Sequence, residues 1–218
     1  MKKSVYSLVL SDEVVKEADK LAYKLNKNRS GIINEILAEY LSLTTPEVRI
    51  KQILKSLEDS IKLFPEFKIQ PAAADSVFIV KSALRYKYNP VIKYNVALFK
   101  NNRHCFGSIK AGIRTQNGEL ISAMNDFFKL FSETEKKLLD FHGQKLHEFS
   151  NGYLLRKFLI GADDENADEV IGKSVSAYID NLDSMTKRYF DCILNGVSPR
   201  ADMVKMYENY LKHADVIL

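Results

Sequence analysis

The sequence of 218 residues has no tryptophan and only two cysteines. Cys105 and Cys192 lie far apart and form no Cys-x-x-Cys pair, which excludes zinc-finger spacing and argues against a disulfide framework. No segment approaches the roughly 18 apolar residues of a membrane span. The N-terminus lacks both the apolar run and the cleavage site of a signal peptide. We therefore expect a cytoplasmic protein with no membrane contact.

The motifs of common enzyme classes are missing as well. There is no Walker A loop, no GxGxxG, no GxSxG and no HExxH. The acidic residues within 163–169 are crowded as in a solvated turn and helix start. His142 and His147 are five apart, so on a helix they turn away from each other, and His104 and Cys105 point to opposite faces of a strand. We expect no catalytic residues, no metal site and no cofactor.

What the sequence does contain is enough apolar material for a folded core. Hydrophobic residues make up 46% of the chain, which is typical of a globular protein. The length favours two unequal domains. The patterns predict an α+β protein with a small domain over residues 1–45 and a larger domain over residues 46–218. The formal net charge of +4 is mild, so the positions of the charges matter more than their sum.

The small domain shows one strand followed by two helices. Residues 3–10 alternate in side-chain type and are rich in Val, Leu and Tyr, which predicts a strand. Ser11 is a suitable N-cap for a helix with apolar residues at helical spacing over 14–25. Residues 28–30 form a turn with a second cap, and a second amphipathic helix follows over 32–41.

A lone strand cannot satisfy its own backbone hydrogen-bonding groups. We expect it to pair with its copy in a second chain, giving a two-stranded antiparallel ribbon over four helices. Such a ribbon fits the DNA major groove. Alternate strand residues face opposite sides. The inward set is Tyr6, Leu8 and Leu10, which we expect in the dimer core with Leu21, Ile33 and Leu37, and the outward set is Val5, Ser7 and Val9.

Residues 4–43 resemble the ribbon-helix-helix family of bacterial and phage DNA-binding proteins, which includes Arc, MetJ and CopG. The strand VYSLVLS, the helix start Asp12-Glu13-Val14 and the turn Asn28-Arg29-Ser30-Gly31 carry this resemblance. The resemblance implies that the outward strand residues read bases. It also implies that backbone amides at Ser30 and Gly31 hold a phosphate, and a helix N-terminus independently favours an anion. Further phosphate contacts are expected from Lys2, Lys3, Lys27, Asn28 and Arg29.

The chain departs from the family in its outward strand residues, which are usually polar or basic. Val5 and Val9 cannot hydrogen-bond a base, but valine can pack on thymine methyl groups. This indicates recognition of A·T-rich DNA, with Ser7 making the polar contact, or weak sequence discrimination. The alternative is that Val5 and Val9 pack against protein.

The larger domain is predicted to begin with a possible linking helix over 46–64, followed by a three-stranded antiparallel meander. A hairpin turn at Asn101-Asn102 would set Leu98 opposite Cys105. One face of the meander is predicted to be buried: Val80, Leu84, Tyr86, Ile92, Tyr94, Val96, Leu98, Ile109 and Ile113. The other is basic: Lys81, Arg85, Lys87, Lys93, Lys110 and Arg114.

For this basic face, a solvated surface is the favoured interpretation and a second anion-binding surface is the alternative. After Gly118 several helices are predicted, one starting at a capping box at Ser132 and ending near Asn151-Gly152.

The sequence therefore favours a homodimeric protein that binds double-stranded DNA, most simply as a transcriptional repressor or regulator. Two alternatives remain open: an accessory protein of plasmid partition or conjugation that recruits machinery through its larger domain, and an antitoxin. The larger domain could support higher-order assembly, sense a ligand or bind a protein partner.

Overall fold

The structure, a computed structural model, describes residues 5–41, 43, 45–100, 105–141, 143–159 and 167–216. The chain divides into two compact units, unit 1 over residues 1–48 and unit 2 over residues 49–218. The predicted boundary at residue 45 falls within a few residues of this division. Each unit is described by itself.

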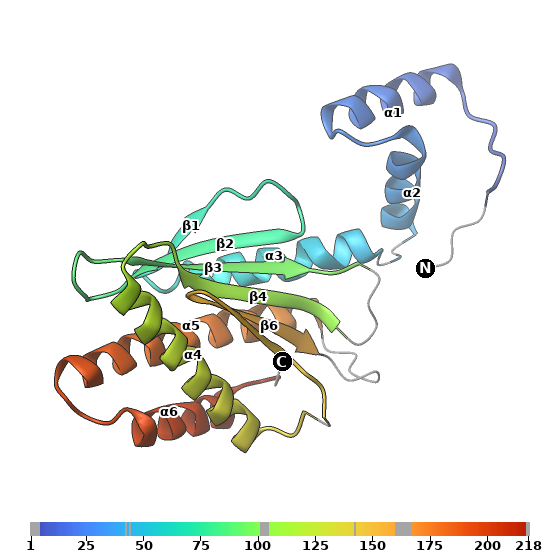
Figure 1. Ribbon diagram of the computed structural model, residues 1–218. Helices are drawn as coiled ribbons and strands as arrows, with labels where there is room; N and C mark the ends of the chain where they lie inside the picture. Colours follow the sequence, from blue (N-terminus) through green and yellow to red (C-terminus); the bar gives the residue numbers. More distant parts are fainter. Residues whose placement is uncertain are drawn as a thin grey trace. The chain divides into compact units, whose positions relative to one another are not determined.

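Unit 1 contains two helices joined by a tight turn (Figure 1). Helix α1 spans Asp12–Lys24 and helix α2 spans Arg29–Tyr40. The turn begins at Asn26, which has a φ of 51° in the left-handed region that asparagine tolerates. The amide of Lys27 donates to the carbonyl of Ala22 at 2.8 Å. This hydrogen bond closes the last turn of α1. The two predicted helices are both present.

The predicted N-terminal strand is not formed in the single chain. Residues 5–10 make an irregular segment that leads directly into α1, and residues 1–4 lie outside the described part. Ser11 is the N-cap of α1, as predicted, and its hydroxyl accepts from the amide of Val14 at 3.4 Å. A strand exists only beside another strand, and within the described part of unit 1 the chain provides none.

Unit 2 is built on a six-stranded sheet in which all neighbouring strands are antiparallel, in the order β1-β2-β3-β4-β6-β5. The strands are β1 Lys68–Gln70, β2 Val77–Ala83, β3 Val91–Leu98, β4 Cys105–Ile113, β5 His147–Ser150 and β6 Tyr153–Leu159. The helices are α3 Pro46–Ile61, α4 Gly118–Leu138, α5 Asp168–Leu194 and α6 Arg200–His213. Helix α3 begins at Pro46, as predicted.

The predicted meander corresponds to β2, β3 and β4, but its register was wrong by two residues. Leu98 lies opposite Gly107 rather than Cys105. The amide of Phe99 still donates to the carbonyl of Phe106 at 2.8 Å, so the loop is longer than a two-residue turn. The predicted turn residues 101–102 lie outside the described part. A shift of two keeps every side chain on its face, and the predicted buried set is confirmed, with Tyr86 partly buried.

The prediction of only three strands was wrong. After Gly118 the predicted helices around 121–131, 170–182 and 199–213 are confirmed as parts of α4, α5 and α6, but the helix predicted to end near Asn151-Gly152 is wrong, because strands β5 and β6 lie there. Ser132 does not start a helix, because α4 continues through it and Ser132 is buried. The hydroxyl of Thr134 bonds back to the carbonyl of Leu130 at 2.9 Å inside the same helix. Asn151 and Gly152, with φ of 33° and 83°, form the hairpin turn between β5 and β6 rather than a helix end.

The helices pack against one face of the sheet, and Figure 1 shows α4, α5 and α6 gathered along one side of it. The hydroxyl of Tyr94 in β3 donates to Asp183 in α5 at 2.8 Å, and the ring of Phe158 in β6 packs on Tyr178 in α5. Helix α5 also lies very close to α3, because a Cβ on Gly172 would come within 2.5 Å of the carbonyl oxygen of Ile53.

The buried core of unit 2 therefore lies between this face and the helices. No helix in the described ranges is both long and apolar enough to cross a bilayer.

Candidate nucleic-acid interface

The residues predicted to face DNA bases lie in the segment before α1. Val5 and Val9 are fully exposed, and Ser7 is exposed as well. The inward set of Tyr6, Leu8 and Leu10 is also exposed, although Leu10, beside α1, retains only 38% of its surface. The segment thus presents large apolar side chains that have no cover within the described part of the single chain.

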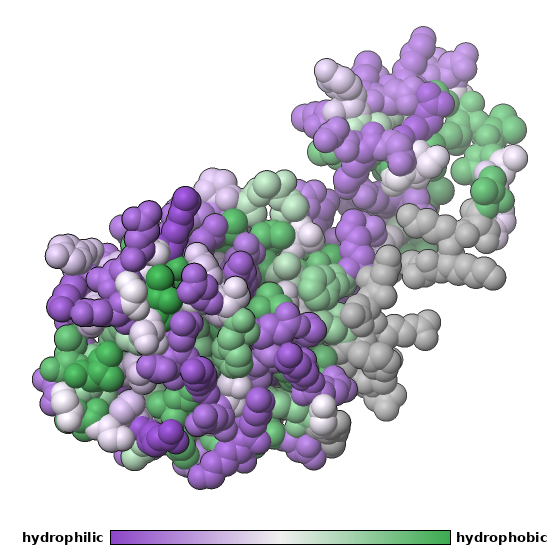
Figure 2. Space-filling model, in the orientation of Figure 1, coloured by the Kyte–Doolittle hydropathy of each residue, from purple (hydrophilic) through white to green (hydrophobic). Residues whose placement is uncertain are grey.

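The helices of unit 1 leave much of their apolar surface uncovered. The buried hydrophobic residues of unit 1 in the described ranges are Ala18, Ala22, Ile32 and Ala38. Of the predicted dimer core, Leu21 and Leu37 are 37% and 45% exposed and Ile33 is half-buried. Figure 2 shows the segment before α1 as a hydrophobic patch beside hydrophilic helix surface. Four buried apolar residues, three of them alanines, make a very small core, and larger apolar side chains of unit 1 stay exposed.

The start of α2 leaves backbone amides of its first turn without acceptors inside the helix. Asn28 is the N-cap, and its side-chain oxygen accepts the amide of Gly31 at 2.7 Å. The amide of Gly31 is therefore already engaged by the cap. The amides of Arg29 and Ser30, in the first turn, have no acceptor inside the helix and stay available to an anion. The phosphate contacts at Ser30 and Gly31 stay predictions, and at Gly31 the side chain of Asn28 would compete with the phosphate for the amide.

The cations beside this helix start are paired within unit 1. Arg29 donates from Nε and Nη2 to the two carboxylate oxygens of Asp19 at 2.6 and 2.5 Å, and this hydrogen-bonded pair lowers the pKa of Asp19. Lys27 bonds to Glu35 at 2.7 Å. Lys2 and Lys3 lie outside the described part. Seven basic and seven acidic side chains cancel over residues 1–48, so unit 1 has no charge excess.

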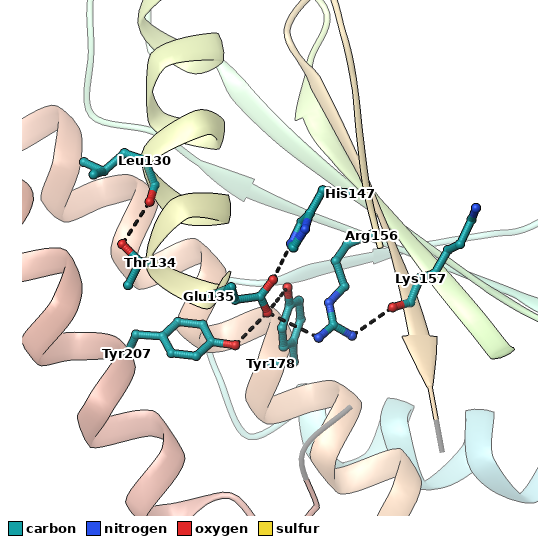
Figure 3. Close-up of polar contacts among 8 residues, drawn as sticks. All are labelled: Leu130, Thr134, Glu135, His147, Arg156, Lys157, Tyr178 and Tyr207. Carbon is teal, nitrogen blue, oxygen red and sulfur yellow. Dashed lines mark hydrogen bonds and ion pairs between the residues drawn. The ribbon is translucent and has the colours of Figure 1, made fainter. Parts of the chain in front are cut away.

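A second group of chemically notable residues surrounds Glu135 inside unit 2 (Figure 3). One carboxylate oxygen of Glu135 accepts from Tyr178 at 3.0 Å and from Tyr207 at 2.6 Å. The other contacts Nε2 of His147, and Nη2 of Arg156 lies 3.4 Å from the first. These five residues come from α4, β5, β6, α5 and α6. We call them the Glu135 cluster.

The Glu135 cluster is completely buried, with at most 2% of any of the three side chains of Glu135, His147 and Arg156 exposed. Burial alone raises the pKa of Glu135, but the positive charge of Arg156 and the hydrogen bonds from His147 and Tyr207 outweigh it and hold the pKa below its usual value. The guanidinium of Arg156 also lies over the rings of Tyr178 and Phe158. The contacts of the Glu135 cluster join strands β5 and β6 to helices α4, α5 and α6.

Sequence patterns could not reveal the Glu135 cluster. The partners of Glu135 lie 12 to 72 residues away along the chain, without any motif spacing. The sequence predicts a capping box in the segment that contains Glu135, and it predicts a helix where His147 lies in strand β5.

A smaller buried site surrounds Asp183. Its carboxylate accepts from Tyr94 and from Ser82 at 3.0 Å and pairs with Lys187 at 2.5 Å. Burial raises the pKa of Asp183. This site ties α5 to β2 and β3.

Within the described ranges, no three His, Cys, Asp or Glu residues are arranged to hold a metal ion. His104, His142 and residues 163–166 are outside these ranges. The chain matches no family model, no curated protein and no solved structure. The resemblance of residues 4–43 to the ribbon-helix-helix family therefore rests on those residues alone.

Proposed function

We propose that this protein is a homodimer that binds double-stranded DNA through unit 1 and acts as a transcriptional regulator. The observation that carries the proposal is the segment over residues 5–10. It alternates in side-chain type, leads directly into two helices, and lacks a strand partner in the described part of the single chain. A second copy supplies that partner, because two such segments can pair as an antiparallel ribbon.

Dimerisation would also cover the exposed apolar surface of unit 1. Fully burying a leucine or isoleucine stabilises a protein by about 1.5–3 kcal/mol. Leu21, Ile36 and Leu37 are 37%, 48% and 45% exposed. Covering the rest of each contributes roughly 0.5–1.5 kcal/mol per side chain, in both chains of the dimer.

In the proposed complex the ribbon lies in the major groove. Val5 and Val9 contact thymine methyl groups and Ser7 hydrogen-bonds a base edge. At each flank, the amides of Arg29 and Ser30 hold a phosphate at the start of α2. The two copies of α2 then fix the orientation of the ribbon without reading sequence.

The decisive experiment is selection of duplexes from random DNA by the full-length protein, followed by Ser7→Glu. We expect the wild type to select an A·T-rich site and the variant to lose specific binding in a mobility-shift assay, because the added carboxylate repels the groove. Ser198→Glu, at an exposed position before α6, adds the same charge elsewhere and serves as the control.

The folding of Ser7→Glu is checked by its sedimentation as a dimer, since Ser7 points away from the dimer core. A wild type that selects no duplex, or a Ser7→Glu variant that binds the selected site as tightly as the control, would refute the proposal.

A further inference from the structure

The sheet face that points away from the helices carries five lysines. We call it the lysine face: Lys68, Lys81, Lys93, Lys110 and Lys157. In the register of the sheet Lys68 lies directly opposite Lys81, and Lys81 directly opposite Lys93. The sequence had placed Lys81, Lys93 and Lys110 on this face. Arg85, Lys87 and Arg114 lie beyond the strand ends.

Like charges directly opposite each other on neighbouring strands destabilise a sheet. The strands are about 4.8 Å apart, so three ammonium groups share a row roughly 10 Å long. Lys81 donates to Gln70 at 3.2 Å, which does not neutralise it. Among the described residues, neither Lys68 nor Lys93 has an acidic side chain within ion-pair distance.

The remaining charges do little to offset this row. Lys157 pairs with Glu148 at 3.0 Å, and Glu148 is the one acidic side chain on this face within the described strands. Lys110 lies over the ring of Tyr153, 4.6 Å from its centre, and stays exposed. The face therefore keeps a concentrated positive charge whose repulsion an anionic partner would relieve.

The net positive charge of the chain also lies in unit 2. Residues 49–218 contain 25 basic and 21 acidic side chains, so the net charge of +4 belongs entirely to unit 2. Unit 1, with the proposed base-reading ribbon, contributes none. The long-range attraction toward a polyanion therefore originates in unit 2.

We propose that the lysine face binds the sugar-phosphate backbone of double-stranded DNA without sequence preference. Besides its lysines, the face carries many aliphatic side chains, such as Val77, Ile79 and Leu155, which cannot hydrogen-bond base edges. The choice of DNA over an acidic protein rests on the proposed function of unit 1. DNA held by unit 1 is present at high effective concentration near unit 2 of the same chain.

The test compares two triple variants of the full-length chain. Lys68→Gln, Lys93→Gln and Lys110→Gln together remove three charges from the lysine face. Lys129→Gln, Lys205→Gln and Lys212→Gln together remove three charges from exposed positions of α4 and α6. Binding of a random-sequence duplex is followed by fluorescence anisotropy between about 50 and 200 mM salt.

Each phosphate contact contributes about 0.9 to the slope of log K against log salt concentration. We expect the lysine-face variant to lose up to about 2.7 of that slope and at least tenfold in affinity at the lowest salt, while the α4/α6 control keeps the wild-type slope. The lysine-face variant should melt at or above the wild-type temperature, because it loses like-charge repulsion.

The outcomes separate this inference from the proposed function. A lysine-face variant with the wild-type slope overturns the inference, even if the wild type selects a specific site through Ser7. Equal losses in both triple variants overturn it too, since they indicate a general charge effect. Loss confined to the lysine-face variant supports it, even if no specific site is selected and the role of unit 1 fails.

Discussion

The Glu135 cluster allows a quantitative prediction about stability. Glu135→Gln keeps the shape of the side chain and removes its charge. The amide oxygen can still accept from Tyr207, but Arg156 then remains buried in the same place without its counter-ion. The variant therefore isolates the electrostatic part of the interaction from its packing.

Removing one partner of a buried ion pair costs about 3–5 kcal/mol, because it leaves an uncompensated buried charge. Tyr207→Phe removes a single hydrogen bond to the carboxylate, of 2.6 Å, and should cost about 1.5–3 kcal/mol. Glu208→Gln, at an exposed position of α6, should stay within about 0.5 kcal/mol of wild type. Because most domains have a free energy of unfolding of only about 5–15 kcal/mol, Glu135→Gln should remove a large part of it.

The assay is urea unfolding at neutral pH followed by circular dichroism, with the free energy of unfolding compared among the three variants. We expect the loss to be largest for Glu135→Gln, smaller for Tyr207→Phe and negligible for Glu208→Gln. A Glu135→Gln variant as stable as Glu208→Gln would refute the conclusion that Glu135 is an ionised group holding sheet and helices together.

The pH dependence follows from the lowered pKa of Glu135 in the folded chain. A carboxyl whose folded pKa lies below its unfolded value of about 4.3 stabilises the fold above that value. This stabilisation is lost as the pH falls through the folded pKa. The difference between wild type and Glu135→Gln should therefore be full at neutral pH and shrink below about pH 4. A difference that grows on acidification would contradict the assignment.

Two further predictions concern unit 1. Leu37→Glu should convert the dimer to a monomer in sedimentation equilibrium, because the added charge would be buried in the proposed dimer core. Tyr23→Glu, at a position 91% exposed, is the control. A dimeric Leu37→Glu variant would contradict the predicted core. Asp19→Asn should release Arg29 from its carboxylate partner and raise affinity for the selected DNA several-fold in the mobility-shift assay. Weaker binding would show instead that Asp19 positions Arg29 for DNA and does not compete with DNA for it.

The buried face of β2, β3 and β4 could be predicted because the side-chain period of a strand is two. Val80, Tyr94 and Ile109 all lie in the core, although the hairpin pairing was misplaced by two residues. An error of one residue would have reversed the faces. The prediction thus depended on which alternate residues are apolar, which can be seen in the sequence. It did not depend on the length of the loop, which the sequence specifies poorly.

The hairpin of β5 and β6 could not be predicted because buried charge interrupts its pattern. In β6 the inward residues are Leu154, Arg156 and Phe158, so a fully buried arginine stands where an apolar residue is expected. Its partner Glu135 likewise interrupts the apolar pattern on the inward face of α4, because a charged residue stands where an apolar one is expected. Each charge is acceptable inside only because the other is there, and such a pairing of distant residues leaves no local signal.

The two proposals together explain why a protein with a small DNA-binding unit would carry a large second unit. A ribbon that presents two valines and one serine offers few hydrogen bonds to bases, and the neutral charge of unit 1 gives little attraction to phosphate. Under the two proposals, sequence preference and affinity would have different sources: the ribbon would discriminate between sites, and the lysine face would supply the salt-dependent binding to any site. Because free energies from linked units add, weak discrimination by the ribbon is sufficient once the second unit keeps the DNA close.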